Sequence, residues 1–172
     1  YAQEALELSQ KLNFQIGIAK SYRALAVASF FNNDHPKSID YLLLSASQAA
    51  SISEWNLEAK AYLNLGAIYS GVLGNYPKAM EYYTKALNTF ELHKIDGERY
   101  NAYAGIASVF TSQKEYDKAL EYYLKSLELL EKTKDKSSLA TICKNIGDLH
   151  MSKNEIDEAE KYYVKALENF ER

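Results

Sequence analysis

An internal repeat of about 40 residues constrains this chain more than any other feature of its sequence. Three independent markers share this period: an opening tyrosine, a small residue within a predicted helix, and a second small residue in the next predicted helix. The opening tyrosines are 40, 41, 40 and 40 residues apart, at Tyr1, Tyr41, Tyr82, Tyr122 and Tyr162. The small residues are Ala26, Gly66, Ala107 and Gly147 in the first set and Ser38, Ala79, Ala119 and Ala159 in the second. Their agreement indicates a row of similar structural units.

Each unit has the pattern of two helices. Tyr62, Leu65, Gly66 and Tyr69 recur at i, i+3, i+4 and i+7, which is one face of a helix, and residues 79–90 show the same spacing. The breaks between helices are short and polar, at residues 32–34, 74–75, 113–114 and 153–154. Each pair leaves an apolar flank that only the next pair covers. The units are therefore expected to stack into an all-α solenoid of antiparallel helix pairs.

The composition agrees with this fold and argues against several functions. Only 7 Gly and 2 Pro occur among 172 residues, too few for the turns of an all-β domain. A net charge of −3 argues against nucleic acid as the main ligand. No apolar run approaches the roughly 20 residues of a membrane-spanning helix, so no membrane contact by this segment is predicted.

The glycines within helices predict close contact between helices. Gly in a helix interior is about 0.5–1 kcal/mol less favourable than Ala. Gly66 and Gly147 are therefore expected where another helix approaches closely. The rings of Tyr83, Tyr123 and Tyr163 are predicted to fill the spaces between neighbouring helices.

At these positions the chain resembles the tetratricopeptide repeat family, in a variant with long helices. The fullest copy of the family pattern consists of Tyr62, Leu65, Gly66, Tyr69, Ala79, Tyr83 and Ala86. The first copy is the weakest, with Ser29, Ser38, Leu42 and Ser45 at pattern positions. The usual period is about 34 residues; the longer one here also suits HEAT-type repeats, which lack this set of small residues and tyrosines. The resemblance implies a right-handed superhelix whose concave groove binds a protein or peptide.

We predict a single domain over residues 1–172. Residues 1–14 are predicted to form a lone second helix, followed by four repeats over residues 15–54, 55–94, 95–135 and 136–172. Because the first residue lies inside a predicted helix and the last helix looks like an internal helix and not a polar cap, the segment is expected to belong to a longer chain. A cytoplasmic location is expected, with which the single cysteine is compatible.

No motif in the sequence indicates catalysis. There is no Gly-rich phosphate loop, no His-Glu-x-x-His and no Cys-x-x-Cys, so we expect no enzymatic activity, no cofactor and no metal site. His35, His93 and His150 fall in three different repeats. Cys143 occupies the position of a tyrosine in other repeats, and a buried apolar role is predicted for it. The paired tyrosines of the second helices resemble a stacking platform for bases, but their helical spacing favours a place in the core.

The resemblance also implies which face binds. In the family, the face of each first helix that points away from the core lines the concave groove. The candidate binding residues on this face are Lys20, Arg23, Phe30, Phe31, Lys60, Leu63, Asn64, Asn101, Lys144 and Asn145. Together with Asp148, the face carries four basic residues and one acid, hence +3 in a chain of −3, which predicts an acidic or polar peptide as the ligand. A solvated face with chance charges is the alternative.

Three functions remain open at this point. The family's clamp for a terminal carboxylate is not predicted, because Arg23 and Asn64 match its pattern while Val27, Asn101 and Gly105 do not. The leading hypothesis is a non-catalytic interaction scaffold that binds a partner segment in the groove. One alternative is the sensory region of a bacterial signal transducer, such as a histidine kinase or transcription regulator. The other is a structural solenoid that self-associates through its end helices.

Overall fold

The computed structural model describes residues 1–170, and this part of the chain consists of nine α-helices and no β-strand. The all-α prediction is confirmed; Glu171 and Arg172, the end of the predicted fourth repeat, lie outside the described residues. The helices are α1 (Ala2–Lys11), α2 (Gln15–Phe31), α3 (His35–Ser51), α4 (Trp55–Gly71), α5 (Tyr76–Leu92), α6 (Arg99–Ser112), α7 (Tyr116–Glu131), α8 (Lys136–Ser152) and α9 (Ile156–Phe170). Within residues 1–170, none of these helices has both the length and the apolar character needed to cross a membrane.

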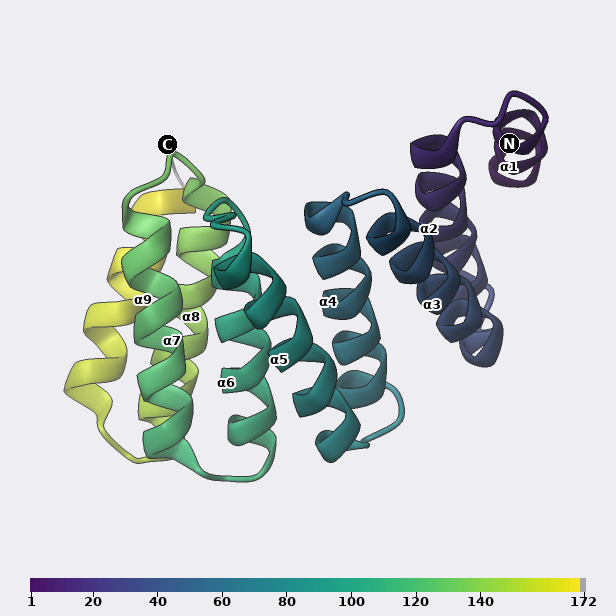
Figure 1. Cartoon of the computed structure of the whole chain (residues 1–172). Coiled ribbons are helices and arrows are strands. Elements are labelled where there is room, and N and C mark those ends of the chain that lie inside the picture. Colours follow the sequence, from purple (N-terminus) through teal and green to yellow (C-terminus); the bar gives the residue numbers. More distant parts are fainter. Residues whose placement is uncertain (171–172) are drawn as a thin grey trace. The chain divides into compact units, whose positions relative to one another are not determined.

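The helices, which Figure 1 labels in chain order, belong to two compact units. Unit 1 extends from Tyr1 to Ile95 and contains α1 to α5, whereas unit 2 begins at Asp96 and contains α6 to α9. Within unit 1 each helix packs on the next, from α1 on α2 to α4 on α5. The same order of packing holds from α6 to α9 within unit 2. Because short turns join neighbouring helices, they run antiparallel, as the sequence pattern predicts.

A single left-handed residue reverses the chain after most helices. Asn13, Asn33 and Asn154 have φ values of 52°, 59° and 60°. In the turn after α2, the backbone N–H of Asp34 then donates to the carbonyl of Ser29 at 2.9 Å. This bond satisfies a carbonyl in the last turn of the helix, and asparagine adopts the left-handed conformation more readily than most residues do. The short polar breaks of the sequence are therefore tight turns.

Capping side chains and prolines begin the second helices of unit 1. Asp34 and Asn75 each accept a hydrogen bond at 3.2 Å from the backbone N–H three residues later. Pro36 and Pro77 lie in the first turn of the same helices, where a backbone N–H would have no partner within the helix. These residues determine where α3 and α5 begin, and so which side chains face α2 and α4.

Two glycines allow neighbouring helices to approach closely, as predicted. A Cβ atom at Gly66 would lie 2.7 Å from ring carbons of Tyr83, and one at Gly147 would lie 2.7 Å from the ring of Tyr163. Both distances are shorter than carbon atoms tolerate, so a side chain at either glycine would push the helices apart. Each tyrosine ring lies directly against the backbone of the preceding helix.

An aromatic stack closes the pair formed by α4 and α5. Trp55, the first residue of α4, stacks on His93, which follows α5, with ring centroids 4.2 Å apart and planes within 8° of parallel. Both residues belong to unit 1, and Trp55 is the only tryptophan in the sequence. The stack therefore holds the N-terminus of α4 against the C-terminus of α5.

Candidate functional site

The predicted groove residues divide between the two units. Unit 1 carries Lys20, Arg23, Phe30, Phe31, Lys60, Leu63 and Asn64 on α2 and α4, and unit 2 carries Asn101, Lys144 and Asn145 on α6 and α8. All ten side chains are exposed or half-buried, so none belongs to the fully buried core. Both sets are therefore accessible to a ligand on the surface of their own unit.

Unit 1 contains a mostly apolar cavity of about 270 Å³ where α2, α3 and α4 meet, called here the α2–α4 pocket. Its lining consists of Ala26, Val27, Phe30 and Phe31 of α2, Ser38 and Leu42 of α3, and Asn64, Ala67 and Ile68 of α4. Three predicted groove residues, Phe30, Phe31 and Asn64, thus share one cavity. The other four predicted residues of unit 1 lie outside the lining.

The α2–α4 pocket has an exposed aromatic mouth and a buried aliphatic floor. Phe31 is 77% exposed, and Phe30 meets it edge to face with ring centroids 5.9 Å apart. Phe30 also contacts the His35 ring, at 5.4 Å between centroids. Leu42 and Ile68 form the floor and are only 1% and 4% exposed. Apolar walls of this kind favour an apolar ligand group.

One polar side chain of the lining is available to a ligand. The Ser38 hydroxyl already donates to the backbone carbonyl of Ala26 at 2.8 Å. Asn64 is half-buried, and its amide can both donate and accept hydrogen bonds. The pocket therefore combines a large apolar surface with a single amide, which suits a side chain together with the peptide backbone next to it.

Basic side chains continue from the pocket along α2. Arg23 lies one turn before Val27 on the same helical face, and Lys20 lies almost one further turn before Arg23. Within residues 1–170, neither Lys20 nor Arg23 forms an ion pair. In unit 2, by contrast, Lys144 pairs with Asp148 at 2.7 Å. The positive charge of the predicted face is thus partly neutralised in unit 2, whereas the charges of Lys20 and Arg23 are available beside the pocket in unit 1.

Comparison with known proteins identifies the repeat. The profile of the tetratricopeptide repeat family matches residues 17–91 and 98–172, which together make up most of the chain. The chain belongs to this family. No curated protein matches its sequence.

Several solved structures share the fold of this tetratricopeptide repeat chain at low sequence identity. BtubC from P. vanneervenii is 18% identical, with a TM-score of 0.80 over 98% of this chain and 72% of its own. Aspartyl phosphate phosphatase F from Bacillus subtilis is 19% identical, with a TM-score of 0.83 over 95% of this chain and 44% of its own. A signal transduction ATPase with a tetratricopeptide repeat sensor, from Pyrococcus horikoshii, is 20% identical, with a TM-score of 0.79 over 94% of this chain and 25% of its own. These likenesses establish the fold.

The alignment of the tetratricopeptide repeats accounts for one part of the pocket. Leu42 occupies the position held by tyrosine in the later repeats, including Tyr83 and Tyr123. Tyr83 lies against Gly66, and its hydroxyl is 3.4 Å from that of Ser70. Tyr123 is 4% exposed and belongs to the core where α6, α7 and α8 meet, the junction that corresponds to α2, α3 and α4. The smaller leucine leaves the place of a tyrosine ring unfilled.

The α3 side of the pocket is the part that the sequence analysis missed. Ser38 and Leu42 lie on α3, a second helix, whereas the predicted groove includes first helices alone. The signal for them is nevertheless present, because the first tetratricopeptide repeat departs from the family pattern at both positions. A leucine in place of a large ring predicts a cavity wherever the surrounding helices keep their spacing.

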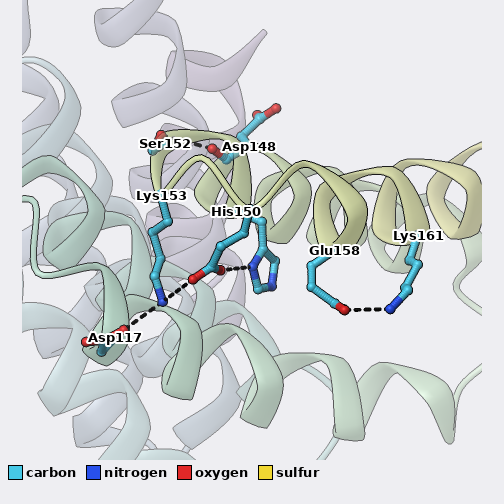
Figure 2. A network of polar contacts seen from close by, with 8 residues as sticks. Asp117, Asp148, His150, Ser152, Lys153, Glu158 and Lys161 are labelled. Atoms are coloured by element: carbon cyan, nitrogen blue, oxygen red, sulfur yellow. Dashed lines mark hydrogen bonds and ion pairs between the residues drawn. The ribbon is translucent and has the colours of Figure 1, made fainter.

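A polar network in unit 2 joins the ends of three helices (Figure 2). Lys153, after α8, contacts Asp117 of α7 at 2.9 Å and Glu155 at 3.1 Å. The Glu155 carboxylate in turn contacts Nδ1 of His150 at 2.6 Å. His150 is buried and stacks on Tyr162 of α9 at 5.5 Å between ring centroids. These contacts give the network a structural role in the last tetratricopeptide repeat.

The remaining candidates for chemistry are buried or scattered. Cys143 is fully buried, as predicted, and burial raises the pKa of its thiol, which makes it a poor nucleophile at neutral pH. Across residues 1–170, no group of three or more His, Cys, Asp or Glu side chains is arranged to hold a metal ion. The α2–α4 pocket is therefore the feature on which a functional proposal rests.

Acid is expected to weaken the network of unit 2 through Glu155. Hydrogen bonds from His150 and Lys153 lower the pKa of the Glu155 carboxyl. Such a carboxyl stabilises the fold above its ordinary pKa, and this contribution is lost as the pH falls through the lowered value. We therefore expect Glu155→Gln to melt below the wild type at neutral pH, and the gap between the two midpoints to close as the pH falls through the lowered pKa of Glu155. Circular dichroism melts at several pH values measure this, and a gap that does not change with pH would contradict it.

Proposed function

We propose that this chain is a non-catalytic scaffold that binds a segment of a partner protein in the α2–α4 pocket and along the exposed faces of α2 and α4. Tetratricopeptide repeats are generally protein-interaction modules, which supports a binding role. The observation that carries the proposal is a preformed apolar cavity beside the exposed ring of Phe31. Cavities with apolar walls and a few polar groups are typical ligand sites.

The side chains around the pocket favour an acidic or polar partner segment with an apolar anchor. Lys20 and Arg23 supply positive charge, but an exposed charge pair contributes only about 0–1 kcal/mol. Burial of apolar surface contributes about 25 cal/mol per Å², so contacts to the pocket supply most of the affinity. The amide of Asn64 can bind the backbone of the same segment.

Filling the mouth of the pocket is expected to weaken binding at least tenfold. Selection of a phage-displayed peptide library on the wild-type protein supplies ligands, and titration of labelled synthetic peptides measures their affinity. Ala67→Trp places a large ring in the lining, on an exposed position of α4 where the core is not disturbed. Ala28→Trp makes the same change at an exposed position of α2 outside the lining and is the matched control. Peptides that bind Ala67→Trp as tightly as the control would contradict the proposal.

Reversing the charge beside the pocket is expected to weaken acidic ligands by about tenfold or less at physiological salt, where screening acts over about 8 Å. The variant Lys20→Glu/Arg23→Glu tests this with the selected peptides. Lys144→Glu is the control, because Lys144 lies in unit 2 and is already paired with Asp148. Equal losses in the two variants would argue against recognition beside the pocket.

A sensory role in a signal transducer is the second candidate function. It is favoured by the similarity to a signal transduction ATPase with a tetratricopeptide repeat sensor, of which this chain covers 25%. In that role, occupation of the pocket would regulate a catalytic or DNA-binding segment of the same polypeptide. The coding sequence on either side of this segment distinguishes the two functions. A kinase, ATPase or DNA-binding segment in the same reading frame supports the sensor, and a polypeptide made of repeats alone supports the scaffold.

A further inference from the structure

We infer that the α2–α4 pocket receives an aromatic side chain of the partner segment and that Arg23 recognises an acidic residue two positions away from it. This inference rests on the proposed function and specifies the ligand that the same site takes. It follows from two features of unit 1, the leucine at position 42 and the distance from the pocket to Arg23.

The other repeats indicate which group fits the pocket. In the later repeats a tyrosine stands where Leu42 stands in the first. The ring of Tyr83 lies against the backbone at Gly66, and Tyr123 is 4% exposed at the junction that corresponds to the pocket. The α2–α4 pocket thus occupies the place that an aromatic ring fills within the protein itself.

The walls of the pocket also favour an aromatic ring. Its volume of about 270 Å³ is large enough to admit one. Phe30 and Phe31 are already arranged edge to face at one side, with ring planes at 81°. Aromatic rings prefer this geometry and offset stacking, so a third ring from a partner gains specific contacts here.

The position of Arg23 determines where the acidic residue lies. Arg23 precedes Val27, a lining residue, by four positions on one helical face, which is about 6 Å along the axis of α2. An extended peptide advances about 3.3 Å per residue, and its side chains at i and i+2 point to the same side. A carboxylate two positions from the aromatic anchor therefore reaches Arg23, which is half-buried and forms no ion pair within residues 1–170.

The first test uses the tightest peptide from the library selection, synthesised with single alanine replacements. Replacing the aromatic anchor is expected to weaken binding about 10- to 100-fold. Replacing an acidic residue two positions away is expected to weaken it about two- to fivefold, and this second loss should disappear with Arg23→Gln protein. Lys11→Gln removes a charge at the end of α1 and is the control, with which both losses should persist. A ligand without an aromatic anchor, or an acidic residue whose effect persists with Arg23→Gln, would overturn the inference.

The second test fills the pocket from inside. Leu42→Tyr restores the residue of the later repeats, so it is expected to weaken the same peptide at least tenfold while the thermal midpoint stays equal or rises. Leu44→Tyr makes the same change at an exposed position of α3 outside the lining and should leave binding within about twofold. Circular dichroism shows whether both variants are folded. A folded Leu42→Tyr protein that binds like the wild type would overturn the inference.

The two proposals fail in different ways. If no selected peptide responds to Ala67→Trp, the proposed function fails and the inference fails with it. If peptides respond to Ala67→Trp but carry no aromatic anchor, or keep their affinity for Leu42→Tyr, only the inference fails.

Discussion

Gly66→Leu and Gly147→Leu are each expected to lower the thermal midpoint of unfolding by about 5–10 °C. At both glycines even a Cβ atom would lie 2.7 Å from a tyrosine ring of the next helix, and leucine adds three further carbons. Overpacking of this kind costs about 1–3 kcal/mol or more. Each kcal/mol shifts the midpoint of a chain of this size by about 2–4 °C. Scanning calorimetry of the purified variants measures the shift.

Gly71→Leu is the matched control for these two variants. Gly71 is the last residue of α4, the helix that contains Gly66, and apart from its chain neighbours and the nearby backbone of its own helix no atom lies within 4 Å of a Cβ built on it. Its midpoint is expected to stay constant or rise slightly, because leucine favours a helix more than glycine does. If all three variants had the same thermal midpoint, close helix contact would not be the reason for glycine at position 66.

Phe90→Ala is expected to destabilise the fold by about 3–5 kcal/mol. Phe90 lies near the end of α5. It is the largest fully buried side chain within residues 1–170, with 0% exposure. Truncation to alanine removes most of its apolar surface and leaves a cavity, because neighbouring helices relax only in part. Urea unfolding followed by circular dichroism gives the free energy of unfolding of both proteins.

Phe170→Ala is the control for burial. Phe170 occupies the same repeat position 80 residues later, in α9, but is 59% exposed. Its truncation is expected to change the free energy of unfolding by about 0.5 kcal/mol or less. Similar losses in the two variants would mean that burial of the ring does not determine its contribution.

The helix pairs could be predicted from the sequence because each depends on local, repeated signals. The spacing of Tyr62, Leu65 and Tyr69 selects one face of α4, and tight polar turns separate it from its neighbours. The role of Gly66 could also be predicted. A glycine within a helix is less favourable than alanine, and this cost is tolerated where another chain segment must come close. These inferences need no knowledge of distances.

The candidate site could be predicted only in part. Phe30, Phe31 and Asn64 were recognisable from their helical face, and all three line the pocket. The cavity itself depends on the volume that Leu42 leaves between three helices, which no single helical pattern contains. The ion pair that neutralises Lys144 could be predicted in part, because its partner Asp148 lies four residues later on the same helix.

The stack of Trp55 on His93 provides an optical probe of one half of the protein. Trp55 is the only tryptophan in the sequence and belongs to unit 1, so intrinsic indole fluorescence reports on that unit alone. The far-ultraviolet dichroism of the helices, by contrast, sums over both units. If emission and dichroism change at the same urea concentration, the two units unfold as one cooperative block, and if they separate, each has its own stability. The difference between the two unfolding midpoints, measured on one sample, therefore shows how strongly the stability of one unit depends on that of the other.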